Sequence, residues 1–177
     1  SGNAQRAGLP HPEIFAALVP GAELLLVPNG SPYWRNKQAT RYKMVGDRVA
    51  ETNVPVIYLN QVGGQDELVF DGSSMAVNAE GECCVQAPSF QEGLYPVHFE
   101  LLPGVAEGAH LSVTSGTLTT ADTIEAGLYK ALVLGVRDYV NKNGFKGVVL
   151  GLSGGIDSAL TLVIAADALG ADRVQAV

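Results

Sequence analysis

The residues with the clearest chemical potential lie in the segment LSGGIDSA, at positions 152–159, between two apolar runs. Gly154 and Gly155 have no side chains, so an anion can approach their backbone N–H groups closely. Ser153 and Ser158 add hydroxyl donors to the same short stretch. Where a strand leads into a helix, the first amides of the helix also carry partial positive charge. The pattern therefore predicts a phosphate-binding loop.

Asp157 would repel a bare phosphate, so its presence needs a separate explanation. It fits as a helix-start residue or as a ligand for Mg²⁺ carried by the phosphates. The Walker A pattern GxxxxGK[ST] is absent, and no Lys in the segment can reach a transferred γ-phosphate. From the residues alone two interpretations stay open: a phosphate loop unlike that of kinases and GTPases, or a strand-to-helix turn whose glycines serve packing.

Strands and helices must surround this segment for it to bind a ligand. The apolar run 147–152 predicts a strand, and residues 156–169 predict a helix that Gly170 ends. A further strand is predicted from Val174. Such an alternation of strands and helices is typical of a parallel α/β domain.

A longer amphipathic helix is predicted before the first of these strands. Asp122 can cap it, with Glu125 three residues later as in a capping box, and Gly144 follows as a stop signal. Its predicted buried face consists of Ile124, Leu128, Leu132, Val136 and Val140.

The first half of the chain predicts a mixture of strands and a helix. Residues 22–27 and 55–60 are short apolar runs that predict buried strands, and residues 36–52 predict an amphipathic helix. The predicted buried face of this helix contains Tyr42, Val45 and Val49.

Two further segments of the first half follow. Residues 62–72 are predicted as a loop, and residues 74–78 and 83–87 as a hairpin. Cys83 and Cys84 then lie in one strand, as small packing residues that face opposite sides of the sheet.

Composition narrows the classes of function. A net charge of −7 argues against a nucleic-acid surface built from basic patches. No apolar run approaches the ~18 residues of a membrane span, and no signal peptide opens the sequence. The only two cysteines are adjacent, which suits neither a disulfide framework nor a metal knuckle. We therefore expect a cytoplasmic protein that binds small molecules, with no nucleic acid or membrane partner.

The string LSGGIDSA resembles the SGGxDS signature of the PP-loop ATP pyrophosphatases. That family cleaves ATP between the α- and β-phosphates and forms an adenylated substrate, from which a nitrogen or sulfur nucleophile displaces AMP. The resemblance implies ATP and Mg²⁺ as cofactors, with Asp157 near the Mg²⁺. It assigns ATP binding to Gly151, Leu152, Ser153, Gly154, Gly155, Ile156, Asp157 and Ser158.

The segments GAELLLVPNGSPYWRNK and VPVIYLNQVGGQDELVFDG resemble the C-terminal part of a nitrilase-type glutaminase domain. Joined to a PP-loop, they make the chain similar to the glutamine-dependent NAD⁺ synthetases. The resemblance implies an α/β fold: a nitrilase-like α-β-β-α sandwich fragment, then the first unit of a Rossmann-like parallel α/β (PP-loop, adenine nucleotide alpha hydrolase-like) domain. It implies a ligase in which ammonia from glutamine attacks adenylated deamido-NAD (nicotinic acid adenine dinucleotide) and gives NAD⁺. A homo-oligomer is expected.

The predicted domain division follows a change of character along the chain. Residues 88–121 carry Pro, Gly, Thr and Ser with little periodicity, which predicts a structureless linker. We expect a glutaminase-like part over 1–90, a linker over 91–121 and a synthetase part over 122–177. Because the chain opens at Ser1 without a Met, we expect a middle piece of a longer enzyme, inactive alone.

The resemblance also assigns a glutamine pocket at the NGSP segment, residues 29–32, where Ser31 touches substrate glutamine and Lys37 lines the same pocket. A hydroxyl can bond an amide, and an ammonium can pair with the α-carboxylate. Without the resemblance, a turn serine and a solvated lysine explain the same residues. The Cys, Lys and Glu of nitrilase-type catalysis lie upstream in the family, and no Cys precedes Gly21, so no catalytic residue is assigned here.

Asp66, Glu67 and Asp71 form an acidic group that matches no calcium-loop spacing and has no His nearby. We expect them to shape a pocket or a contact between domains or subunits rather than hold a metal.

Two alternatives to a glutamine-dependent NAD⁺ synthetase stay open. One is another PP-loop ligase, acting on a nucleotide or on transfer RNA; the glutaminase-like half disfavours it, and the acidic charge disfavours the RNA version. The other is a non-catalytic nucleotide-binding or assembly module, which the missing nucleophile would favour.

Overall fold

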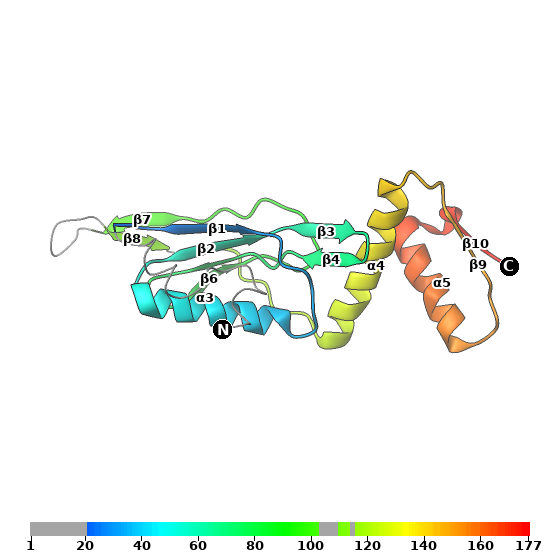
Figure 1. Cartoon of the computed structure of the whole chain (residues 1–177), viewed down its shortest axis with the longest axis horizontal. Helices are drawn as coiled ribbons and strands as arrows, with labels where there is room; N and C mark the ends of the chain where they lie inside the picture. The colour runs from blue at the N-terminus through cyan, green and yellow to red at the C-terminus, as the bar shows by residue number, and fades with distance from the viewer. Residues whose placement is uncertain (1–20, 103–109, 114–115) are drawn as a thin grey trace.

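The computed structural model describes residues 21–102, 110–113 and 116–177. Figure 1 shows an elongated molecule in which a sheet and one helix occupy one end, and two helices with a short parallel sheet occupy the other. A β-hairpin lies between the two ends and meets the first of those two helices.

A four-stranded sheet with the order β1-β2-β5-β6 forms the N-terminal end. Its first two strands are parallel and the other pairs antiparallel. The predicted strand at 55–60 and the predicted hairpin of 74–78 with 83–87 are confirmed. The strand predicted at 22–27 starts later and is not fully buried, because it is an edge strand with one face toward a helix. The strands are β1 (Leu25–Asn29), β2 (Val56–Asn60), β5 (Met75–Val77) and β6 (Cys83–Gln86).

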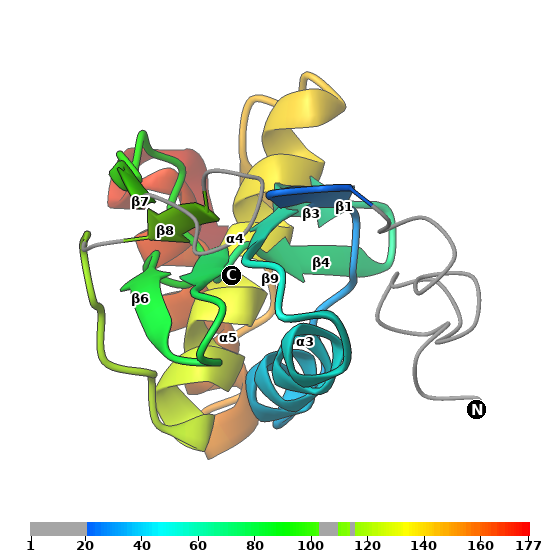
Figure 2. The same ribbon diagram turned by 90° about the vertical axis from the view of Figure 1, so that its left-hand side faces the viewer.

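Helix α3 (Lys37–Thr52) covers one face of this sheet, as Figure 2 shows in a view close to the helix axis. Its predicted span of 36–52 is confirmed, but Tyr42 is not on the buried face, because 41% of it is exposed. The three buried residues are Arg41, Val45 and Val49. The two valines pack in one cluster with Val56, Tyr58, Met75 and Val77.

The segment 62–72, predicted as a loop, instead forms a β-hairpin. Its strands β3 (Val62–Gln65) and β4 (Leu68–Asp71) pair antiparallel. Asp66 has φ +51° in the turn between them, a conformation that Asp adopts more readily than most residues. The prediction was wrong because two glycines interrupt the apolar alternation by which a strand is recognised.

Another hairpin lies where a structureless linker was predicted. β7 (Phe99–Leu102) and β8 (His110–Val113) pair antiparallel, so the segment 88–121 is not structureless. Val113 is buried against the sheet. This hairpin packs on sheet residues that are distant in sequence, such as Ala76 and Val85, so the local sequence pattern does not predict it. The domain bounds themselves stay a prediction.

Helix α4 (Ile124–Lys142) begins one residue later than predicted, because a cap at Asp122 would place its first residue at 123. Thr123 is the N-cap, and its hydroxyl oxygen accepts a hydrogen bond from the Ala126 N–H at 3.2 Å. Asp122, the predicted cap, instead accepts from the Lys130 ammonium at 2.6 Å. The predicted cap was therefore wrong by one residue.

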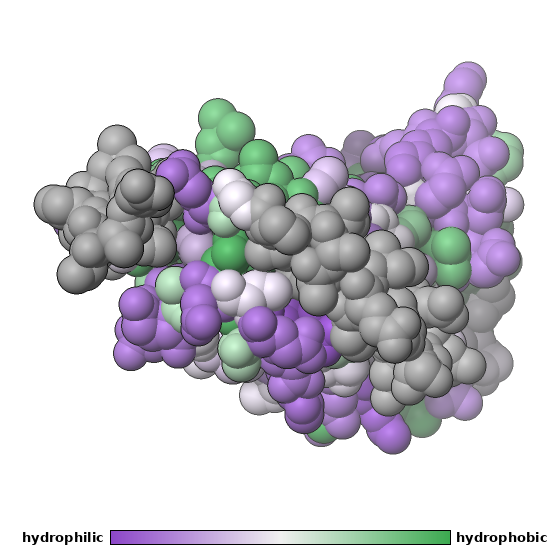
Figure 3. Space-filling model, turned by 60° about the vertical axis from the view of Figure 1, so that its left-hand side comes forward, coloured by the Kyte–Doolittle hydropathy of each residue, from purple (hydrophilic) through white to green (hydrophobic). Residues whose placement is uncertain are grey.

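The predicted buried face of α4 is wrong over its first turns. Ile124, Leu128 and Leu132 are 44%, 42% and 52% exposed. The helix packs on the β3–β4 hairpin along one side and on a second helix along another. Its buried residues therefore do not form one apolar face. Hydrophobic residues also reach the surface elsewhere in the molecule (Figure 3). The buried residues of α4 are Gly127, Ala131, Leu134 and Val140.

The C-terminal end is the predicted strand–helix–strand unit. β9 (Val148–Leu150) and β10 (Val174–Ala176) pair in parallel, and α5 (Ile156–Leu169) spans the predicted residues. A short 3-10 helix, η1 (Ala171–Arg173), precedes β10. None of the helices in the described residues combines the length and apolar character that a bilayer crossing demands.

Replacing Thr123 with Ala should lower the free energy of unfolding by about 1 kcal/mol, because the substitution removes the hydroxyl that caps α4. Urea unfolding of the purified chain measures this loss. Thr123→Ser keeps the hydroxyl and is the matched control. Equal losses for the two variants would show that Thr123 does not act as a cap.

Candidate functional site

The two sets of predicted site residues lie at different places in the fold. The NGSP segment at 29–32 follows β1, and residues 151–158 connect β9 to α5. Each set follows a parallel strand at its carboxyl end, the edge at which α/β sheets bind ligands. Helix α4 lies between the two places in Figure 1, so the structure does not bring the sets together.

Ser31 is buried, with 2% of its surface exposed. Its N–H donates to Asn60 Oδ1 at 2.8 Å, and its carbonyl accepts from Arg41 Nη2 at 2.8 Å. Its Oγ accepts from Arg41 Nε at 3.3 Å. Both the main chain and the hydroxyl of Ser31 therefore have fixed positions.

Arg41 is itself held by a buried ion pair with Asp71 at the end of β4. Nη1 lies 2.7 Å from Asp71 Oδ2 and Nη2 lies 2.8 Å from Oδ1, a bidentate geometry. The two side chains are 0% and 3% exposed. Ser73 Oγ donates to Asp71 Oδ2 at 3.3 Å. This pair ties α3, the NGSP segment and the β3–β4 hairpin together.

Arg41 and Asn60 were not predicted as part of this site, whereas Asp71 was expected as an acidic residue that shapes a pocket or a contact, and it does line the cavity beside Lys37. Arg41 stands four residues before Val45 on the buried face of α3, so its position on an apolar stripe was the available signal. A charge at such a position needs a partner, since almost no charged side chain is buried unpaired.

Lys37 begins α3, is half-buried, and lines a cavity of about 160 Å³. Tyr33, Trp34 and Asp71 line the same cavity, and residues at the start of α4 close its other side. Ser31 is not among the lining residues, so the structure does not place Ser31 and Lys37 in one cavity.

Two phenols beside these residues keep their protons at neutral pH. Burial raises the pKa of Tyr33, and the Asp71 and Asp122 carboxylates raise it further. Burial also raises the pKa of Tyr58, whose hydroxyl accepts a hydrogen bond from Asn29 Nδ2 at 3.0 Å. Neither phenol is therefore available as a base at neutral pH, and the Tyr58 hydroxyl serves as a hydrogen-bonding group.

The loop before α5 has the backbone geometry that an anion needs. Gly154 has φ +81°, and a Cβ built on it would meet nothing within 4 Å. Gly155 is the N-cap of α5, and no side chain caps the helix, so its first amides are available to a ligand. Ser153 Oγ and Ser158 Oγ lie 3.1 Å apart at the same helix end.

The remaining predicted residues of the loop are all exposed. Gly151 follows β9, and the Leu152 N–H donates to the Val177 carbonyl at 2.8 Å, which extends the pairing of β9 with β10. Ile156 begins α5 and is 81% exposed. Asp157 lies in the first turn of α5, with its carboxylate at the surface where a phosphate-bound cation can reach it.

Comparison with family models assigns both halves of the chain. The model of carbon-nitrogen hydrolase matches residues 11–101, and the model of NAD synthase matches residues 128–177. The chain belongs to the carbon-nitrogen hydrolase family. The expected fold, a nitrilase-like part followed by a PP-loop region, is confirmed.

Relatives of this chain match across both halves. A glutamine-dependent NAD(+) synthetase of Rhodobacter capsulatus is 51% identical over 168 residues, which are 94% of this chain and 30% of that protein. Its counterpart in Acinetobacter baylyi is 50% identical over 155 residues, 88% of this chain and 27% of that protein. The chain thus spans about 30% of the length of these relatives.

A solved relative agrees in three dimensions. The structure of glutamine-dependent NAD+ synthetase from Acinetobacter baumannii in complex with ADP has a TM-score of 0.78 and 43% sequence identity. The match covers 93% of this chain and 29% of that one. The resemblance to glutamine-dependent NAD⁺ synthetases inferred from the sequence is therefore confirmed.

Cys83 and Cys84 do not have the character of the nucleophile that the carbon-nitrogen hydrolase family uses. Cys83 packs in the cluster beneath α3, and Cys84 packs on the opposite face of the sheet, as predicted. Burial raises the pKa of the Cys83 thiol, and the neighbouring Cys84 raises it further. Burial also raises the pKa of the Cys84 thiol. Protonated thiols are poor nucleophiles, so both residues serve packing.

The acidic hairpin residues do not gather as metal ligands. Asp71 pairs with Arg41, and Asp66 lies in the hairpin turn. Over residues 21–102, 110–113 and 116–177 no group of three or more His, Cys, Asp or Glu side chains is placed to hold a metal ion.

Replacing Asp71 with Asn should lower the free energy of unfolding by about 3–5 kcal/mol, because Arg41 would stay buried opposite a neutral amide. Urea unfolding of the chain measures the change. Asp47→Asn is the matched control, since Asp47 pairs with Lys43 at the exposed surface of α3 and contributes about 0.5 kcal/mol or less. Similar small losses in the two variants would contradict the role given to the buried pair.

Proposed function

We propose that this chain is the central part of a ligase that converts deamido-NAD to NAD⁺, with ATP as the energy source and glutamine as the ammonia donor. The observation that carries the proposal is that one chain contains both segments. The NGSP segment is held by hydrogen bonds from Asn60 and Arg41, and the SGG loop leaves the first amides of α5 open to an anion. The relatives named as glutamine-dependent NAD(+) synthetases match across both.

The nucleotide is assigned to residues 151–158. The first amides of α5 and the open backbone at Gly154 suit the negatively charged phosphates, and Ser153 and Ser158 supply hydroxyls to the same oxygens. Asp157 would hold a Mg²⁺ that travels with ATP as part of the substrate. The Acinetobacter baumannii relative was solved in complex with ADP, which supports an adenine nucleotide as a ligand of this protein.

The chemistry follows from how the phosphates are held. With the β- and γ-phosphates bound at the start of α5, the α-phosphorus is left open to attack by the carboxylate of deamido-NAD. Pyrophosphate leaves as the P–O bond to the β-phosphate breaks, and the acyl adenylate forms. Ammonia then attacks the acyl carbon, the nitrogen releases one proton to solvent, and AMP leaves with its bonding electrons. The loop contributes binding and charge stabilisation, the terms that dominate phosphate chemistry.

Glutamine recognition is assigned to Ser31 and to Lys37, which lie six residues apart between the end of β1 and the start of α3 although they do not line one cavity. The Ser31 hydroxyl is fixed by Arg41, and the Lys37 ammonium can pair with the substrate α-carboxylate at its cavity. The Cys, Lys and Glu that hydrolyse glutamine are not supplied by this sequence, so this part of the chain positions substrate. The same proposal divides the chain into a glutaminase-like part over 1–90, a linker over 91–121 and a synthetase part over 122–177. It also includes assembly into a homo-oligomer and a cytoplasmic location.

Asp157→Asn in the complete ligase should raise the KM for Mg-ATP at least about tenfold, because it removes the charge that holds the metal. Glutamine hydrolysis should stay close to wild type, since α5 lies far from the NGSP segment. Steady-state assays of NAD⁺ and of glutamate measure the two activities. Lost glutamine hydrolysis with normal use of ATP would contradict the assignment.

Lys37→Ala should raise the KM for glutamine about tenfold, the effect of losing one hydrogen bond to a charged group. NAD⁺ synthesis from added ammonium salt should be unchanged, because ammonia does not need the glutamine pocket. Lys43→Ala, an exposed lysine of the same helix, is the control. An unchanged KM for glutamine would contradict the proposal that Lys37 binds the substrate.

A further inference from the structure

The outer edge of β3 is occupied by side chains of α4 instead of another strand. The Gly64 N–H donates to Asp138 Oδ2 at 2.7 Å, and the Lys142 ammonium donates to the Gly64 carbonyl oxygen. In an antiparallel strand both polar groups of one residue point to the same side, here away from β4. Asp138 and Lys142 thus satisfy an edge that would otherwise need water or a further strand.

The contact is close because glycines form it. A Cβ built on Gly64 would lie 3.2 Å from the Asp138 Cβ and 3.3 Å from the Gly135 Cα. A Cβ built on Gly135 would lie 3.3 Å from Val69 Cγ2, a contact tighter than side chains normally make. The hairpin and the helix therefore touch almost backbone to backbone.

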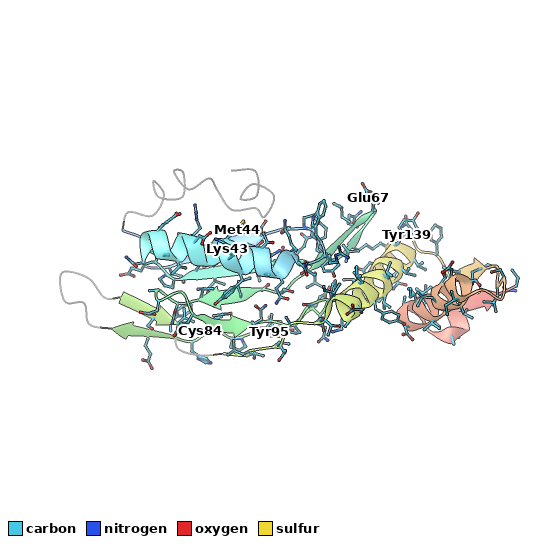
Figure 4. All side chains as sticks on the ribbon, turned by 90° about the horizontal axis from the view of Figure 1, so that it is seen from below. Lys43, Met44, Glu67, Cys84, Tyr95 and Tyr139 are labelled. Carbon is cyan, nitrogen blue, oxygen red and sulfur yellow. The ribbon has the colours of Figure 1, made fainter. Side chains whose placement is uncertain are left out.

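Charges around Asp138 favour its role as a fixed acceptor. The side chain is 17% exposed, and Arg137 Nε donates to its second oxygen at 3.2 Å. The Lys142 ammonium lies 4.0 Å from Oδ2, so it faces both the carboxylate and the Gly64 carbonyl. In Figure 4, Glu67 marks the tip of the hairpin and Tyr139 lies on α4, the neighbouring element.

This contact lies on a continuous path between the two predicted sites. At one end, Asp71 in β4 holds Arg41, which holds Ser31. At the other end, α4 packs on α5 through a buried cluster, and the Tyr129 hydroxyl donates to Asp167 at 2.5 Å. The nucleotide loop leads directly into α5. The position of the loop relative to Ser31 therefore depends on how the hairpin sits on α4.

We propose that Asp138 and Lys142 are positioning residues that join the glutamine-binding part to the nucleotide-binding part by gripping Gly64. Through this joint, ammonia released at the glutamine pocket meets the acyl adenylate instead of escaping to solvent. The proposal rests on the proposed function, since it assigns a role within that reaction.

The grip can be tested in this chain without any substrate. The Gly64 amide should exchange slowly with solvent deuterium, and Asp138→Ala should speed that exchange about tenfold or more, because the amide loses its acceptor. Asp138→Asn keeps one acceptor oxygen and should restore most of the protection. Equal exchange rates of the Gly64 amide in wild type and Asp138→Ala would contradict the proposed hydrogen bond from Gly64 to Asp138, whatever reaction the protein performs.

The coupling is tested in the complete ligase by the ratio of NAD⁺ formed to glutamine hydrolysed. Asp138→Ala and Lys142→Met should lower this ratio about fivefold or more, while synthesis from ammonium salt and the melting temperature stay near wild type. Lys142→Met keeps the test sound if Asp138→Ala fails to fold, because Lys142 is 52% exposed. Asp138→Asn should rescue the ratio.

Asp47→Asn is the control, because it breaks an ion pair with Lys43 on α3, well away from α4 (Figure 4). An unchanged ratio in Asp138→Ala, despite fast exchange of the Gly64 amide, would overturn the coupling. A wild-type ligase that makes no NAD⁺ from deamido-NAD, ammonium salt and ATP would instead overturn the proposed function. The exchange measurement would still test the contact of Asp138 with Gly64.

Discussion

The N-terminal half depends on one buried pair of charges, Arg41 and Asp71. Removing a guanidinium and a carboxylate from water costs several kcal/mol for each ion, and only close pairing with further hydrogen bonds offsets that cost. The geometry must therefore be met by α3, by β4 and by the NGSP segment at once. Ser31 has a defined place because Arg41, held by Asp71, bonds both its carbonyl and its hydroxyl. A requirement of burial thus fixes the position of the NGSP segment, residues 29–32.

Helix α4 extends this arrangement to the second half of the chain. It packs on the hairpin that ends in Asp71, and it packs on α5, whose N-terminus follows the loop with Gly154 and Gly155. Two partners on different sides explain why the buried residues of α4 include glycine and alanine, while Leu128 and Leu132 stay exposed. Small residues let the helix come close to the hairpin, as the contact between Gly64 and Gly135 shows.

Local signals predicted the elements that depend on local physics. Helices over 36–52 and 156–169 were correct, because apolar spacing and helix-ending residues act within a few positions. The turn with Gly154 and Gly155 before α5 was also predicted, because glycines beside a helix start are a local signal, and its role in phosphate binding stays a prediction. The nature of the ligand came from the family resemblance and not from the glycines.

Signals that depend on distant partners were missed. The hairpin at 62–72 is stabilised by α4 and by cross-strand pairing, and its two glycines conceal the strand pattern. The hairpin within 88–121 packs on a sheet formed earlier in the chain. Arg41 was passed over because its partner, Asp71, is 30 residues away. Thr123 and Asp122 are both good cap residues, and only the geometry of the helix start separates them.

The most direct test of the account is a crystal structure of the complete ligase with ATP and Mg²⁺. The β- and γ-phosphate oxygens should lie within hydrogen-bonding distance of the amides and hydroxyls of residues 153–158, with Mg²⁺ beside Asp157 and the α-phosphorus exposed. A triphosphate bound elsewhere, with those amides bonded only to protein, would contradict the account.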